Sequence, residues 1–174
     1  MYAKKISKDN TLKKEIENIL HLCDKYDEEN DGEYSFFGEP VKEEDMLKWE
    51  KENGAQIPES YKEWLRFSGQ CRIAQNTATF WGPDKFHSEC VPDDLIVIGE
   101  LIGDGERVCF SRTTADIVEL FEDQNTKKET FGEIIKRISS ILGDDGDLSD
   151  ERCDEILARI YEKRRKRVLE DSEE

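Results

Sequence analysis

Acidic residues early in the chain have the spacing of a calcium-binding loop. The first, third, fifth and sixth positions of the EF-hand pattern are occupied by Asp27, Glu29, Asp31 and Gly32. The twelfth position requires a bidentate glutamate, but here it is Gly38, and a Gly-Glu-Pro sequence interrupts the helix that should follow. We therefore interpret residues 24–33 as a hydrated acidic loop. Calcium binding is the alternative, and a calcium-dependent shift in melting temperature would favour it.

Other residues that could do chemistry lack the partners that the chemistry needs. His87 and Cys90 are close in sequence, but nucleophilic catalysis also needs an orienting acid, and zinc would need ligands from elsewhere. Gly103 and Gly105 are followed by no helical pattern and no Lys-Ser/Thr pair, so they do not form a phosphate loop. The five cysteines contain no Cys-x-x-Cys pair. The sequence therefore predicts no catalytic residue, no metal site and no cofactor.

The balance of charges restricts the possible partners. Asp and Glu number 42 against 26 Lys and Arg, which gives a formal net charge of -16 at pH 7. A field of this sign repels nucleic acids and anionic membranes and attracts basic proteins. Five consecutive bases at residues 163–167 fall near the end of an expected helix, where they suit the helix dipole and need no nucleic-acid ligand. We therefore expect a protein partner, with no nucleic acid and no membrane.

The sequence also indicates a compartment. The N-terminal lysines are not followed by the apolar run of a secretory signal, and no window approaches the roughly 18–20 apolar residues of a membrane span. The cysteines are odd in number and scattered, as in proteins of reducing compartments. We therefore expect a cytoplasmic protein with reduced, mostly buried thiols.

Periodicity and turn signals predict an α+β fold. Helical spacing is found over residues 11–26, 42–53, 58–69, 130–142 and 150–169. Strand-like segments cover residues 77–81, 94–102, 106–111 and 116–122. Asp104-Gly105 favours a hairpin, and Thr130 with Glu133 resembles a capping box. We expect an antiparallel sheet of about four to six strands with N-terminal helices and C-terminal helices packed around it.

Residues 52–69 form the joint between the second and third expected helices. Gly54 suits the left-handed turn after a helix, Pro58 suits a helix start, and Gly69 suits a helix end. Backbone geometry thus accounts for the special residues, and the joint contains no reacting group. We expect Tyr61, Trp64 and Leu65 to pack against the sheet.

The helix before this joint and the joint itself carry a family pattern. The pattern consists of Met46, Glu50, Gly54, Ile57, Pro58, Tyr61, Trp64, Leu65 and Gly69. It resembles the SUKH superfamily, which includes bacterial immunity proteins and yeast cell-wall assembly regulators. Residues 97–111 resemble the strand–Gly-Asp/Gly–strand element of that superfamily. The sequence departs from the family at Asn53, where an apolar residue is usual, and at Ser68 and Ser111, which often are Asn and Asp.

The length of 174 residues is typical of a single domain, 1–174. The SUKH-like core spans residues 36–142, with an N-terminal helix and acidic loop at 1–35 and a C-terminal helix at 143–174. An inward-pointing Glu50 would need a hydrogen-bond donor that the sequence does not identify.

The resemblance implies a protein that binds another protein and has no enzymatic activity. With the acidic charge, it indicates an immunity protein that neutralises a cognate toxin, expected to be a nuclease with a basic groove. The alternative is a scaffold or regulator that binds several cellular partners. The expected partner-binding residues are Asp27, Glu28, Glu29, Asp31, Asp144, Asp145, Asp147, Trp81 and Phe86. Phe36 and Phe37 are further anchor candidates, and burial in the core is the competing interpretation for every aromatic residue here.

Overall fold

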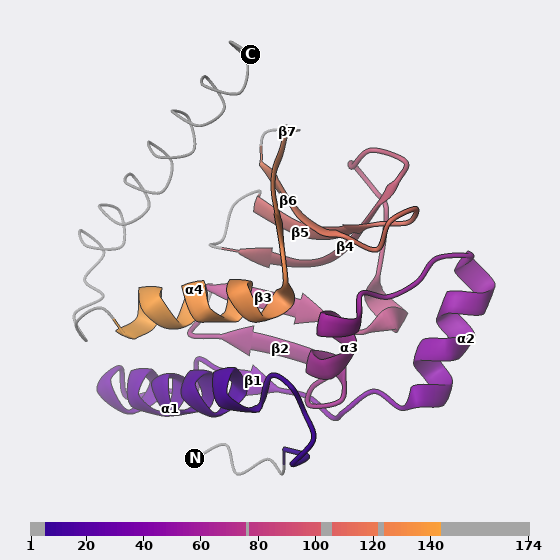
Figure 1. The fold of residues 1–174 in the computed structure, drawn as a ribbon. Coiled ribbons are helices and arrows are strands. Elements are labelled where there is room, and N and C mark those ends of the chain that lie inside the picture. The colour runs from indigo at the N-terminus through magenta and orange to yellow at the C-terminus, as the bar shows by residue number, and fades with distance from the viewer. Residues whose placement is uncertain (1–5, 76, 102–105, 122–123, 144–174) are drawn as a thin grey trace.

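The computed structural model describes the chain in the stretches 6–75, 77–101, 106–121 and 124–143 (Figure 1). Its helices are α1 (Lys13–Glu29), α2 (Glu43–Asn53), α3 (Glu59–Leu65) and α4 (Phe131–Gly143), with a 3-10 helix η1 (Pro83–Lys85). Its strands are β1 (Phe36–Phe37), β2 (Gln70–Ile73), β3 (Ala78–Trp81), β4 (Leu95–Leu101), β5 (Glu106–Ser111), β6 (Ile117–Phe121) and β7 (Gln124–Glu129).

The described strands form one meander in the order β1 to β7, and each is antiparallel to the next. The edge strand β1 has only two residues, so six longer strands make up most of the sheet in the described part of the chain. The predicted α+β fold with an antiparallel sheet is therefore confirmed. Strands β3 to β6 match the expected segments, whereas β2 and β7 were not expected.

The main hydrophobic core lies between the sheet and three helices. Helices α1 and α4 lie side by side over one face of the sheet, α3 lies next to them, and α2 stands at the side of the domain (Figure 1). The Trp64 side chain is 0% exposed at the centre of this core. Its ring lies 5.3–6.3 Å, between centroids, from the rings of Phe37, Phe67, Phe80 and Phe131. Tyr61 and Leu65 are also 0% exposed, which confirms the predicted packing of the third helix.

A second, smaller cluster covers the other face of the central strands. It contains the buried residues Leu95, Val97, Cys109, Val118 and Leu120, with Trp81 and Val91 packed against them. Strand β4 therefore buries side chains on both faces, because Ile96 and Ile98 belong to the main core. This double burial explains the unbroken apolar run of β4, which lacks the alternation of a strand with one solvated face.

The acidic segment at residues 24–33 was predicted to be a loop, but its first six residues are helical, and three of these lie beyond the helical spacing expected over residues 11–26. Helix α1 continues to Glu29, because Tyr26 prolongs its apolar stripe and packs edge-on against Tyr34 at 5.8 Å. The carboxylate of Asp27 accepts hydrogen bonds from the Ser35 backbone N–H at 3.2 Å and from the Ser35 hydroxyl at 3.1 Å. These bonds fix the chain after the helix and give Asp27 a structural role.

The joint between α2 and α3 is built largely as predicted. Gly54 follows α2 with a φ of 61°, the left-handed conformation that glycine accepts without strain. Pro58 precedes α3 as its N-cap. The prediction that Gly69 ends the third helix was wrong, because α3 ends at Leu65. A Cβ atom on Gly69 would lie 2.7 Å from Val41 Cγ2, so glycine allows two chain segments to approach closely there.

Local signals in the second half of the chain are also confirmed. Strands β4 and β5 pair from Leu101↔Glu106 onwards, as expected for a hairpin, although the turn itself lies outside the described residues. At the start of α4, the Glu133 carboxylate accepts a hydrogen bond from the Thr130 N–H at 2.8 Å, and the Thr130 hydroxyl accepts one from the Glu133 N–H at 3.3 Å. The expected helix over residues 150–169 lies outside the described residues.

The described cysteines are free and differ sharply in exposure. Cys23, Cys71 and Cys109 are buried, whereas Cys90 is exposed. Desolvation by burial raises the pKa of the Cys23 thiol to about 12, and it raises the pKa of Cys109 to about 12 as well. Because the thiolate is the reactive form, these buried thiols are inert near neutral pH.

Iodoacetamide at pH 8 is therefore expected to label Cys90 at least about a hundredfold faster than Cys23 or Cys109. Peptide mapping by mass spectrometry at several reaction times measures each site separately. Protein unfolded in urea serves as the control, since there the sites should react at similar rates. Equal labelling of Cys23 and Cys90 in the native protein would contradict this burial.

Candidate functional site

Glu50 connects α2 to the segment before α3 and to α3 itself. Its carboxylate accepts a hydrogen bond from the Ile57 backbone N–H at 2.8 Å and pairs with the Lys62 ammonium at 2.8 Å. The side chains of Glu50 and Lys62 are only 14% and 17% exposed. These are the donors that the sequence left unidentified, and they give Glu50 the role of fixing α2 to α3.

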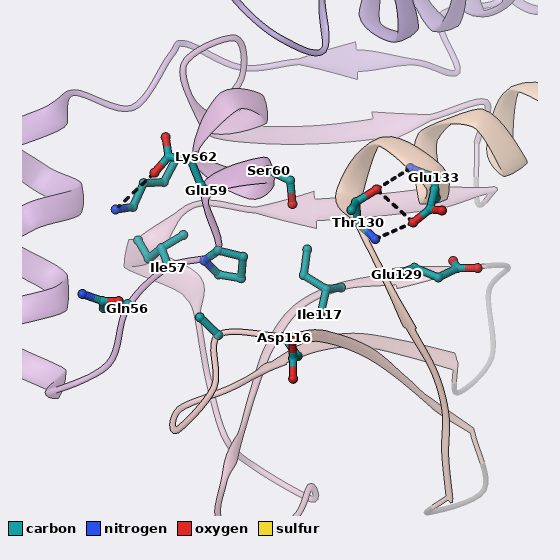
Figure 2. A pocket seen from close by; sticks show the side chains of 12 residues that line it. Gln56, Ile57, Glu59, Ser60, Lys62, Asp116, Ile117, Glu129, Thr130 and Glu133 are labelled. Atoms are coloured by element: carbon teal, nitrogen blue, oxygen red, sulfur yellow. Dashed lines mark hydrogen bonds and ion pairs between the residues drawn. The ribbon is translucent and has the colours of Figure 1, made fainter.

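A hollow of about 570 Å³ opens on one side of the joint (Figure 2). We call it the joint hollow, and its lining is Gln56, Ile57, Pro58, Glu59, Ser60, Lys62, Ala115, Asp116, Ile117, Glu129, Thr130 and Glu133. Figure 2 shows Glu59 and Lys62 on one side, Thr130 and Glu133 across from them, and Asp116 below. The lining thus contains four acids and one lysine.

The acids of the joint hollow already have partners within the fold. Glu133 caps α4, Glu59 lies 2.9 Å from Arg66, and Glu129 lies 3.4 Å from Arg137. The Asp116 carboxylate accepts a hydrogen bond from the Thr114 hydroxyl at 2.8 Å. These carboxylates stabilise the neighbouring elements, and this role accounts for their presence without a ligand.

A second hollow, of about 730 Å³, runs along α2. We call it the α2 groove, and its lining is Phe36, Gly38, Glu39, Pro40, Val41, Asp45, Lys48, Trp49, Glu52, Gly69, Gln70, Pro83 and Asp84. Its volume lies within the range of typical ligand pockets. Aromatic and proline side chains from four separate segments contribute apolar surface to it.

The walls of the α2 groove are rigidly connected to the core. Backbone hydrogen bonds join Gly38 N–H to Gln70 C=O at 2.6 Å and Gly69 N–H to Glu39 C=O at 2.8 Å. On the other wall, the Trp49 ring packs edge-on against Phe86, with 5.1 Å between centroids. The groove is therefore formed before any ligand arrives.

The α2 groove is acidic, and its acids are less engaged than those of the joint hollow. Glu39, Asp45, Glu52 and Asp84 face one base, Lys48. Lys48 lies 3.9 Å from Glu52. Within the described part of the chain, the carboxylates of Glu39, Asp45 and Asp84 form no ion pair. These groups are available to a basic partner.

The structure does not bring the predicted site residues together. Glu28, Glu29 and Asp31 are exposed around the end of α1, on the opposite side of Figure 1 from α2. Trp81 is half-buried against the second cluster, and Phe86 is half-buried between the rings of Trp49, Tyr61 and Phe110. Asp144, Asp145 and Asp147 lie outside the described residues.

Sequence reasoning missed most of the α2 groove. Its four acids are spread over residues 39–84, so they do not form one acidic cluster in the sequence. Phe36 was an anchor candidate, and it is 49% exposed while its neighbour Phe37 is 6% exposed. The alternation along β1 was the one available signal, because successive side chains of a strand face opposite sides.

Within the described ranges, no three His, Cys, Asp or Glu side chains are grouped so that they could hold a metal ion. None of the helices in the described part of the chain combines the length and the apolarity needed to cross a membrane.

Comparison with known families decides what kind of domain this is. A family model described as SMI1 / KNR4 family (SUKH-1) matches residues 40–140. The chain belongs to this family. No curated protein matches the chain significantly. Proteins of the SUKH-1 family are generally binding proteins without catalytic activity. The matched span contains α2, α3, most of α4 and the lining of the α2 groove apart from Phe36, Gly38 and Glu39.

Proposed function

We propose that this SUKH-1 domain is a cytoplasmic immunity protein that binds and neutralises a cognate toxin. The acidic α2 groove carries the proposal, because it combines apolar surface with three carboxylates, those of Glu39, Asp45 and Asp84, that form no ion pair within the described residues. The toxin would be a nuclease, since an enzyme that binds the phosphate backbone needs a basic substrate groove. An acidic protein inhibits such an enzyme by filling this groove or by blocking its entrance, and it needs no catalysis to do so.

Co-expression with the toxin encoded next to this gene tests the proposal. The protein is expected to restore growth of cells that express the toxin and to form a complex with it in low salt. A toxin that kills equally well in its presence, together with the absence of a complex, would exclude the immunity function.

A second candidate function is a scaffold that binds several cellular partners. It is favoured by the joint hollow, which offers a second concave surface beside α3. Gene neighbourhood distinguishes the two functions, because an adjacent toxin gene supports immunity and an isolated gene favours the scaffold.

The exposed acids around the end of α1 are proposed to steer the partner. Exposed charges mainly affect the rate of association, which can reach ~10⁸–10⁹ M⁻¹s⁻¹ for complementary partners at low salt. Asp27 is excluded from this role because it holds Ser35. Glu28, Glu29 and Asp31 remain.

Reversing Glu28, Glu29 and Asp31 to lysine is therefore expected to slow association with the toxin about tenfold at low salt. The association rate should also depend less on salt concentration, and the dissociation rate should change little. Stopped-flow measurements at several salt concentrations give both rates.

A matched control is Glu17→Lys with Glu89→Lys and Glu100→Lys. It changes the net charge equally at exposed positions spread over the surface. If both triple variants slow association to the same extent, net charge alone steers the toxin and the α1 acids have no special role.

A further inference from the structure

We propose that the α2 groove binds an extended basic segment of the partner protein, with basic side chains at every third position. This inference rests on the proposed function and extends it by naming the contact surface and the chemistry of the occupant. Charge, apolar exposure and spacing along α2 each point to such a segment.

The apolar part of the groove offers an anchor that the fold does not use. Phe36 is 49% exposed, although it lies in the edge strand β1 directly beside the buried Phe37. Trp49, Pro40 and Pro83 line the same groove. Grooves lined by aromatic residues bind segments in the polyproline II conformation, whose backbone loses little entropy on binding. An aliphatic or proline side chain of the occupant would remove the Phe36 ring from water.

The acidic side chains of the groove define where positive charges must lie. Asp45 and Glu52 are seven residues apart on α2 and line the same groove. At 1.5 Å per residue, their positions on the helix are separated by about 10.5 Å along its axis. A polyproline II segment rises about 3.1 Å per residue and repeats its side-chain direction every three residues. Basic residues three apart therefore point to one side with a spacing of about 9.3 Å, which fits the two acids.

The remaining acids extend this pattern across the groove. Glu39 lines the groove from the segment after β1, and Asp84 lines it from η1. Lys48 lies between Asp45 and Glu52 in the sequence and contacts Glu52 at 3.9 Å. Both side chains of this pair are exposed, so the pair is weak and a basic side chain of the partner can take the place of Lys48. The preformed walls limit the conformational entropy that is lost when the segment binds.

The test uses a phage-displayed library of random dodecapeptides selected on the wild-type protein. Enriched peptides are expected to carry Lys or Arg three residues apart, with proline or aliphatic residues between them. At 150 mM salt, Phe36→Ser and the pair Asp45→Lys with Glu52→Lys should each weaken binding of the enriched peptides by about tenfold or more.

Two matched controls separate the groove from the rest of the surface. Leu47→Ser removes another exposed apolar side chain of α2, which is 60% exposed and lies outside the groove lining. Glu28→Lys with Glu29→Lys makes the same change in net charge around the end of α1. Both should alter peptide affinity less than about twofold. Leu47 does not line the groove, and 0.15 M salt screens the exposed charges at the end of α1 beyond about 8 Å. Thermal melts of every variant confirm that each one is folded.

The inference is wrong if no peptide is enriched, if the enriched peptides lack basic residues, or if they bind the groove variants as tightly as the wild type. It is also wrong if the protein forms dimers that Phe36→Ser dissociates, since the occupant would then be a second copy. Failure of the proposed function gives a different result, in which basic peptides bind the groove but the toxin is not neutralised. Conversely, full protection from the toxin by both groove variants would refute the α2 groove as the contact surface, but it would agree with the proposed immunity function.

Discussion

Replacing Trp64 with alanine is expected to lower the free energy of unfolding by about 3–5 kcal/mol. The side chain is 0% exposed, and it contacts aromatic rings from β1, β3 and α4. Removing it leaves a cavity where the helical joint, the sheet and the last described helix meet. Urea unfolding followed by circular dichroism measures the loss.

Trp64→Phe is the matched control for this prediction. The Trp64 Nε1 atom is buried and has no hydrogen-bond partner in the described part of the structure, so phenylalanine loses ring volume but no hydrogen bond. We expect it to cost clearly less than alanine does. If Trp64→Ala is as stable as the wild type in urea, the ring does not form the centre of the core.

Replacing Arg137 with alanine is expected to have a similar effect, about 3–5 kcal/mol, for an electrostatic reason. Arg137 on α4 donates hydrogen bonds to both carboxylate oxygens of Glu119 on β6, and Nη2 lies 3.4 Å from Glu129 Oε2. The Glu119 side chain is 1% exposed and that of Glu129 is 5% exposed. Without the guanidinium, these buried charges lose their cationic partner on α4.

The double variant Glu119→Leu with Arg137→Met separates charge from packing. Replacing a buried ion pair by apolar side chains is often neutral or stabilising, so this variant should recover part of the stability that Arg137→Ala loses, although Glu129 still loses its contact with Arg137. Urea midpoints of the two variants and the wild type give the comparison. A double variant less stable than Arg137→Ala would show that the ion pair itself holds α4 on the sheet.

Several elements of this fold were determined by the sequence over short distances. Helix α2, the left-handed Gly54, the capping box of α4 and the hairpin of β4 and β5 all follow from residues within a few positions of one another. Helical periodicity and turn chemistry act at that range. The family pattern was recognisable for the same reason, because most of its positions lie within residues 46–69.

Some local structure escaped prediction because tertiary contacts override composition. Strand β7 has the sequence QNTKKE, which contains no apolar residue, yet it pairs along β6. A strand of this kind forms because its neighbour supplies hydrogen-bonding partners, and its own sequence contains no pattern that predicts a strand. In the same way, α1 continues through an acidic segment because Tyr26 packs on Tyr34 and Asp27 holds Ser35.

The candidate site was decided by the tertiary structure alone. The sequence determined that the protein is acidic and that its joint belongs to a binding family, but it directed attention to acids that are contiguous along the chain. The α2 groove instead collects Phe36, Glu39, Asp45, Glu52 and Asp84 from β1, the following loop, α2 and η1. The close approach at Gly69 and the packing of Trp49 on Phe86 bring these segments together. Such a surface depends on contacts between residues far apart in the chain, which no local pattern encodes.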